Sequence, residues 1–135
     1  MPKKVLWKNQ PADEDYDAAL SFLTLVFPQV AAARLVHALR QARTLERPAK
    51  DLLRASGLPL LPDDEAHVSA DLKRIHKGKP LSPVLLVQGN LEKAVALTVA
   101  DGYHRICAVC YYDENTPIAS RLVPLATNGR GSARG

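Results

Sequence analysis

The sequence has little cysteine and no long apolar segment, and both shortages limit what the protein can be. Its two cysteines, Cys107 and Cys110, lie three residues apart, so they do not form the framework of a disulfide-rich secreted domain. The longest apolar run, residues 18–27, is broken by Ser21 and Thr24 and is too short to cross a membrane. It follows acidic residues rather than a basic leader, which is not typical of a signal peptide. We therefore expect a cytoplasmic protein with no membrane contact.

Length and composition indicate one ordinary globular domain. The chain has 135 residues, of which 47% are hydrophobic and 24% charged, which is enough for a core without disulfide or metal support. The net charge of +4 permits contact with nucleotides or nucleic acid but does not require it. No internal repeat is present.

The N-terminal part, residues 1–45, is predicted to be a helical hairpin preceded by an irregular leader over residues 1–12. Acidic residues begin the first helix, residues 13–26, where the helix dipole favours them. Pro28 suits the start of a second helix that reaches about Thr44. The broad apolar surface of residues 16–27 predicts that the hairpin either covers a sheet or forms a homodimer. Basic residues on the outer side of the second helix are either a solvated face or a phosphate-contacting stripe: Arg34, Arg40 and Arg43.

The rest of the chain alternates helical and strand patterns and predicts an α+β fold over residues 46–125. Residues 46–57 form a connector with one short helical turn that ends at Gly57. A third helix follows, capped by the acidic residues 63–65 and ended by Gly78. The remaining expected elements are strands at 84–87, 94–100 and 118–123 and a helix at 103–112. Residues 126–135 are predicted to be a disordered tail.

The stretch from Ala94 to Cys110 is the most informative part of the sequence. A strand-like apolar run ends at Asp101-Gly102, and the following residues have helical spacing. A helix that starts directly after such a turn presents unpaired backbone N–H groups, which favour an anion such as phosphate. In the alternative interpretation Gly102 only makes a tight turn, and His104 and Arg105 are solvated or capping residues.

Residues from about Lys50 to Val123, just over half of the chain, resemble the ParB/sulfiredoxin-like superfamily. Two motifs carry the resemblance: the lead into a strand, Gly78-Lys-Pro-Leu-Ser-Pro-Val-Leu-Leu-Val87, and the box Val99-Ala-Asp-Gly-Tyr-His-Arg-Ile-Cys-Ala108. The box is similar to G-E-R-R-x-x-A in ParB and to G-C-H-R-x-x-A in sulfiredoxin, and the two motifs occur in the family's order. The resemblance implies a small mixed sheet flanked by helices, with a nucleotide phosphate held at residues 102–105.

Members of this superfamily use the site differently. ParB proteins bind and hydrolyse CTP while loading onto DNA, sulfiredoxins use ATP to repair peroxiredoxin, and some members phosphorylate free serine. Tyr103 stands where sulfiredoxin has its reactive cysteine, which argues against sulfinic acid repair. Asp101 with His104 and Arg105 is closest to the D-G-H-H-R form of the serine-kinase branch. That branch also needs an acidic base elsewhere, which the sequence alone does not assign.

The chemistry of phosphoryl transfer suggests a role for each residue of the box. Gly102 lets the backbone approach a phosphate closely, and the N–H groups of residues 103–105 can donate to it. Arg105 can pair two phosphate oxygens, while His104 can donate to a phosphate or shuttle a proton. Asp101 can hold Mg²⁺ or orient His104, and an equally weighted alternative is that it caps the helix. Ser82 is either a base or ribose contact or a simple loop hydroxyl.

The cysteines and the other histidines do not indicate a functional site. Cys107 and Cys110 have the spacing of half a zinc or redox site, but both fall inside a helix and no second pair exists, so we predict core cysteines. His37, His67 and His76 show no mutual metal-binding spacing.

Three functional hypotheses follow. The first is a nucleotide-binding domain that uses ATP or CTP with Mg²⁺ as an NTPase or phosphotransferase, with Asp101 and His104 as catalytic residues. The second is a DNA-associated binding module, related to partition or a mobile element, with no catalysis of its own. The third is a member of the fold that binds nucleotide and has lost turnover.

Overall fold

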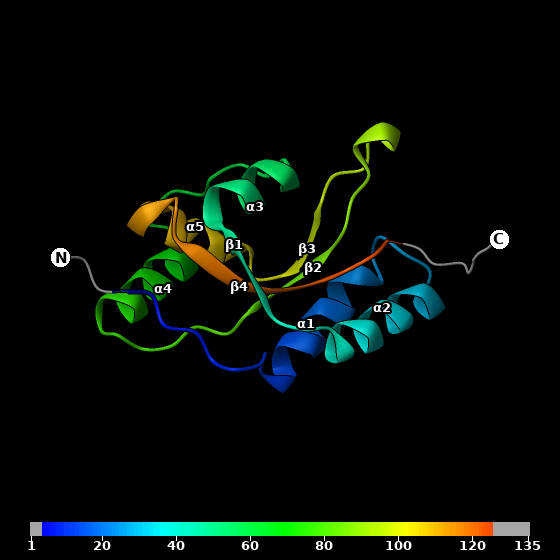
Figure 1. Ribbon diagram of the computed structural model, residues 1–135, viewed down its shortest axis with the longest axis horizontal. Helices are drawn as coiled ribbons and strands as arrows, with labels where there is room; N and C mark the ends of the chain where they lie inside the picture. The colour runs from blue at the N-terminus through cyan, green and yellow to red at the C-terminus, as the bar shows by residue number, and fades with distance from the viewer. Residues whose placement is uncertain (1–3, 126–135) are drawn as a thin grey trace.

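The computed structural model describes residues 4–125, and these form helices on both sides of a four-stranded mixed sheet (Figure 1). The strand order is β1-β4-β2-β3. Strand β2 runs parallel to β4, whereas the β1–β4 and β2–β3 pairs are antiparallel. The bounds of the strands are β1 Leu45–Pro48, β2 Val84–Val87, β3 Thr98–Asp101 and β4 Pro117–Val123. The predicted α+β fold, with a mixed sheet and flanking helices, is confirmed.

The helices lie close to the predicted positions. Their bounds are α1 Asp13–Leu23, α2 Gln29–Gln41, α3 Ala49–Ser56, α4 Ala66–His76 and α5 Tyr103–Asp113, with a short 3₁₀ helix, η1, at Leu91–Lys93. Glu65 caps α4 as predicted, because its side chain accepts hydrogen bonds from the N–H groups of His67 and Val68. Gly57 ends α3 in the left-handed conformation, although α3 has two turns rather than the single turn expected.

The alternating side chains of β2 divide the core into two layers. Val84 and Leu86 pack with the face covered by α3, α4 and α5, whereas Leu85 and Val87 pack with α1 and α2 on the other face. All four side chains are fully buried, because a central strand with helices on both faces has no solvent side. The N-terminal hairpin therefore covers the sheet, which was one of the two roles predicted for its apolar surface.

A buried arginine ties this hairpin to the sheet. The Arg121 guanidinium in β4 donates to the Tyr16 hydroxyl at 2.9 Å and to the carbonyl oxygens of Leu39 and Arg40 at 3.3 and 3.0 Å. Those carbonyls lie in the last turn of α2, where the helix dipole is negative; the Leu39 carbonyl also accepts from the Ala42 N–H at 3.3 Å. The positive charge of Arg121 is thus held by a helix C-terminus.

Two strand predictions need correction. Strand β1 was predicted to be part of a connector, because its sequence Leu-Glu-Arg-Pro has no strand-like alternation. It forms because β4 offers a free edge, and Pro48 is tolerated at the end of an edge strand. The strand predicted at residues 94–100 begins only at Thr98. Its partner β2 has four residues, and Ala94 has a positive φ of 58°, so the ladder cannot extend to residue 94.

Residues 5–8 of the predicted irregular leader are held against the rest of the fold. Val5 is buried, and Trp7 forms an isolated parallel bridge with Leu81. The Leu81 N–H donates to the Leu6 carbonyl, and the Lys8 N–H donates to the Leu81 carbonyl, both at 2.8 Å. Residues 126–135, predicted to be a disordered tail, lie outside the described residues.

Candidate functional site

The turn between β3 and α5 strongly favours glycine. Gly102 has a φ of 115°, and a Cβ atom built on it would lie 2.4 Å from Cγ1 of the buried Val84. The first bond of α5 runs from the Ile106 N–H to the Gly102 carbonyl at 3.0 Å. The N–H groups of residues 103–105 therefore lie in the first helical turn, where the helix itself offers no acceptor. The structure thus builds the strand–turn–helix arrangement that the sequence predicted.

The Arg105 side chain folds back over this turn. Its Nη2 atom lies 2.8 Å from Oδ2 of Asp101, and its Nη1 atom lies 3.9 Å from Oδ1 of Asp15. The three side chains are 15 to 18% exposed. The Arg105 Nε atom is buried and has no hydrogen-bond partner among the described residues. Asp101 thus positions Arg105, while the N-cap position of α5 belongs to Gly102.

The electrostatics of Asp101 follow from its burial. Burial raises the pKa of Asp101 above its usual value, Arg105 acts in the opposite direction, and the nearby Asp15 carboxyl adds to the rise. One oxygen of Asp101 is already paired with the guanidinium. A Mg²⁺ ion at Asp101 would compete with Arg105 for that carboxylate, so these residues do not fit a magnesium site. Nor does Asp101 orient His104, whose nearest acidic partner is Glu65.

Ser82 is used inside the protein. Its side chain is buried, and its hydroxyl donates to Oδ2 of Asp15 and accepts from the Ala12 N–H at 3.2 Å. The only proton of this hydroxyl is therefore engaged by Asp15. Ser82 attaches the first turn of α1 to the segment that leads into β2, an anchoring role that sequence reasoning did not foresee.

A charged cleft of about 260 Å³ lies beside Arg105. Its charged lining residues are Lys8, Glu14, Asp15, Asp71, Arg74 and Arg105. Burial raises the pKa of Asp71, and the nearby Arg105 and Arg74 partly oppose this rise. Asp71 is an acidic group that sequence reasoning missed, and its position on α4 next to Leu72 gave no signal of a site.

His104 lies beside two residues of α4 that the sequence did not connect with it. Its Nε2 atom is 3.9 Å from Oε1 of Glu65, and its ring centroid is 4.6 Å from that of His67. The His67 Nδ1 atom lies 3.2 Å from Oε2 of Glu65. The two helix N-termini thus bring His104 next to Glu65 and His67, which are almost 40 residues away along the chain, and all three are possible metal ligands.

The Tyr103 side chain contacts the loop between α3 and α4. Its hydroxyl donates to the Pro59 carbonyl at 2.5 Å, and the Tyr111 hydroxyl donates to the Leu61 carbonyl at 2.7 Å. Both tyrosines therefore fix the proline-rich loop between α3 and α4 onto α5. Within the predicted phosphate site, Tyr103 contributes its backbone N–H.

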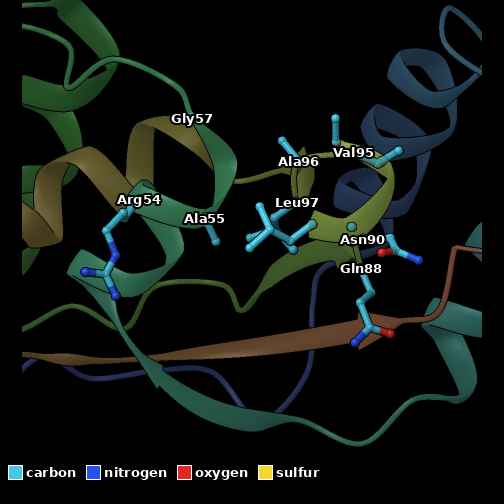
Figure 2. Close-up of a pocket in the computed structure, with 11 residues that line it drawn as sticks. Arg54, Ala55, Gly57, Gln88, Asn90, Val95, Ala96 and Leu97 are labelled. Carbon is cyan, nitrogen blue, oxygen red and sulfur yellow. The ribbon is translucent and has the colours of Figure 1, made fainter.

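A cavity larger than the charged cleft lies elsewhere. It has a volume of about 570 Å³ and lies between the end of α3 and the loop that joins β2 to β3 (Figure 2). Figure 2 shows Leu97 beside this cavity, with Arg54 on the α3 side and Gln88 and Asn90 on the loop side. None of the residues predicted for the site lines it.

The remaining sequence candidates have structural roles or exposed positions. Cys107 is buried and Cys110 half-buried, both as free thiols, in keeping with core cysteines. Arg40 lies 3.5 Å from Asp13 and stacks on the Tyr16 ring at 4.2 Å, so it is not a freely available member of the basic stripe. Arg34 and Arg43 are exposed.

Comparisons with protein-family models, with curated proteins and with solved structures gave no match to this chain. Across residues 4–125, none of the helices has the length and apolar character needed to span a membrane.

Proposed function

We propose that this protein binds the phosphate groups of a nucleotide at the N-terminus of α5 and hydrolyses the nucleotide or transfers its terminal phosphate. One observation carries the proposal: the Arg105 guanidinium is held over the same turn that presents the backbone N–H groups of residues 103–105. A Cβ on Gly102 would lie 3.0 Å from the Arg105 Nη2 atom, so the guanidinium lies beside the first turn of α5. Both groups favour a phosphate there.

The neighbouring cleft supplies further charge for a polyphosphate. Lys8 and Arg74 line it together with Arg105, among the carboxylates of Glu14, Asp15 and Asp71. The three cations can pair with phosphate oxygens where they turn from these carboxylates toward the ligand. His104 lies in the first turn of the same helix, where a ring N–H can donate to a phosphate oxygen.

Asp71 is the candidate base for the attacking hydroxyl or water. It lines the same cleft as Arg105, and burial raises its pKa, which brings a carboxyl closer to the working range of a general base. This assignment supplies the acidic group that the serine-kinase-like form of the box requires and that the sequence left open.

Isothermal titration with ATP, ADP and CTP in the presence of Mg²⁺ tests the binding step. We expect saturable binding of at least one nucleotide, with weaker binding by Arg105→Lys, which keeps the charge but loses the planar fork. Arg34→Ala is the matched control, because it removes an exposed cation of α2 without touching the turn. If the wild type binds no nucleotide, or if Arg105→Lys and Arg34→Ala behave alike, the proposal is wrong.

Turnover is tested separately with Asp71→Asn. We expect this variant to bind nucleotide at least as tightly as the wild type, because a negative charge has left the cleft. Release or transfer of phosphate should fall by about a hundredfold or more, the usual effect of losing a general base. Nucleotide binding by the wild type without any turnover would support the non-catalytic alternative.

A further inference from the structure

Glu65, His67 and His104 form a group of side chains beside the proposed phosphate site, and His104 belongs to both. One ligand atom of each lies within 4.8 Å of the ligand atoms of the other two. Glu65 and His67 lie at the start of α4, His104 lies at the start of α5, and the two helices pack against each other. The group is therefore assembled by tertiary structure.

The spacing suits a tetrahedral ion. Zinc binds imidazole nitrogen and carboxylate oxygen at about 2.0–2.2 Å, which places neighbouring ligand atoms of a tetrahedron about 3.3 Å apart. The Glu65 Oε2 to His67 Nδ1 distance is 3.2 Å, and the Glu65 Oε1 to His104 Nε2 distance is 3.9 Å. These two distances end on different oxygens of Glu65, and one ligand atom of each residue lies within 4.8 Å of the others. A bound ion therefore requires the two imidazole rings to turn inward, and their side chains, 73% exposed for His67 and 41% for His104, have room to do so.

Glu65 is already fixed in position. Its Oε1 atom accepts hydrogen bonds from the N–H groups of His67 and Val68 at 2.8 and 2.9 Å. These bonds fix the carboxylate at the N-terminus of α4. Its second oxygen, Oε2, lies toward His67. The carboxylate also offsets the positive ends of the two helix dipoles, which would otherwise oppose a cation.

We propose that Glu65, His67 and His104 bind a divalent transition-metal cation of the zinc class, with the fourth position open to solvent. Two imidazoles and one carboxylate select such a cation over Mg²⁺, which prefers oxygen ligands alone. The site does not depend on nucleotide binding. When it is filled, the metal places positive charge beside the start of α5.

The test is a titration of the full-length protein, without a polyhistidine tag and after removal of bound metal, with Zn²⁺ in the absence of nucleotide. We expect one ion per chain by calorimetry, and the visible absorption of four-coordinate Co²⁺ when that ion replaces zinc. Excess Mg²⁺ should not displace Zn²⁺. Nucleotide is left out of this titration, and Zn²⁺ is left out of the nucleotide titration. The metal site and the phosphate site are therefore tested independently, and one proposal can fail while the other holds.

Three variants and one control decide the outcome. Glu65→Gln keeps an oxygen for the two backbone N–H groups but loses the carboxylate, while His67→Ala and His104→Ala each remove one imidazole. We expect each to weaken Zn²⁺ binding by about tenfold or more, with an unchanged circular dichroism spectrum. His37→Ala on α2, exposed and distant in the fold, should bind like the wild type. Absence of one-to-one binding, displacement by Mg²⁺, or equal affinities of the four variants would overturn the proposal.

Discussion

The Asp15 carboxylate accepts a hydrogen bond from the Ser82 hydroxyl, although 67 residues separate the two along the chain. The same carboxylate lies 3.9 Å from the Arg105 guanidinium. Asp15 therefore connects the first turn of α1, the segment that leads into β2 and the turn at the start of α5. The N-terminal hairpin thus contributes directly to the surroundings of the candidate phosphate site.

Ser82→Ala should lower the free energy of unfolding by about 1.5–3 kcal/mol, because a partly buried carboxylate loses a charge-assisted hydrogen bond. Urea denaturation measures the loss. Ser21→Ala, at an exposed position on α1, is the control and should change the stability little. An anchoring role also requires that nucleotide affinity be kept, so loss of affinity without loss of stability would favour the ribose contact considered from the sequence.

Gly102→Ala should destabilise the protein more than Gly57→Ala does. Both glycines have a positive φ, which costs a residue with a side chain about 1–2 kcal/mol. At Gly57 nothing lies within 4 Å of an added Cβ, whereas at Gly102 that atom would be 2.4 Å from Val84. The clash adds about 1–3 kcal/mol at Gly102. Equal losses in thermal or chemical denaturation would show that Val84 does not restrict the turn.

Asp71 should make the stability of the folded protein depend on pH. Burial raises its pKa in the folded protein above the ordinary value of 3.8. The folded state then holds this proton more tightly than the unfolded chain, so the contribution of Asp71 to stability is greatest below 3.8 and is lost as pH rises through the raised value. Asp71→Asn should therefore gain stability relative to the wild type between about pH 4 and about pH 7.

Denaturant titrations of both proteins at the two pH values measure this difference. Asp51→Asn on α3 is the control, because Asp51 is half-exposed and its ion pair with Arg54 is solvated. A difference between Asp71→Asn and wild type that stays constant with pH would contradict the role assigned to burial.

Cys110 should react slowly with iodoacetamide. Burial raises the pKa of Cys110 from 9.0 to about 11, so its thiolate fraction near neutral pH falls by about a hundredfold. The greater nucleophilicity of a more basic thiolate recovers part of this loss, which leaves a rate about tenfold or more below that of the urea-unfolded chain. Peptide mass spectrometry follows the modification of Cys110, and equal rates in folded and unfolded protein would refute the prediction.

Local patterns were sufficient for most helices and for the turn. The acidic start of α1, the Glu65 cap and Gly57 at the end of α3 each act through neighbours a few residues away, so their sequence signals are direct. Strand β1 could not be predicted in this way, because its hydrogen bonds come from β4, more than 60 residues away. The start of β3 was predicted at residue 94, four residues too early, for a related reason: the length of β3 is set by its pairing with β2.

The sequence by itself determined that Asp101-Gly102 ends a strand and begins a helix, because glycine conformation and helix-terminal N–H groups are local properties. Only the tertiary structure decided what surrounds that turn. It placed Asp15 and Ser82 beside Arg105, Asp71 in the adjoining cleft, and Glu65 and His67 next to His104. These neighbours come from α1, α4 and the approach to β2, and their meeting depends on how the helices pack on the sheet. No spacing along the chain encodes that packing.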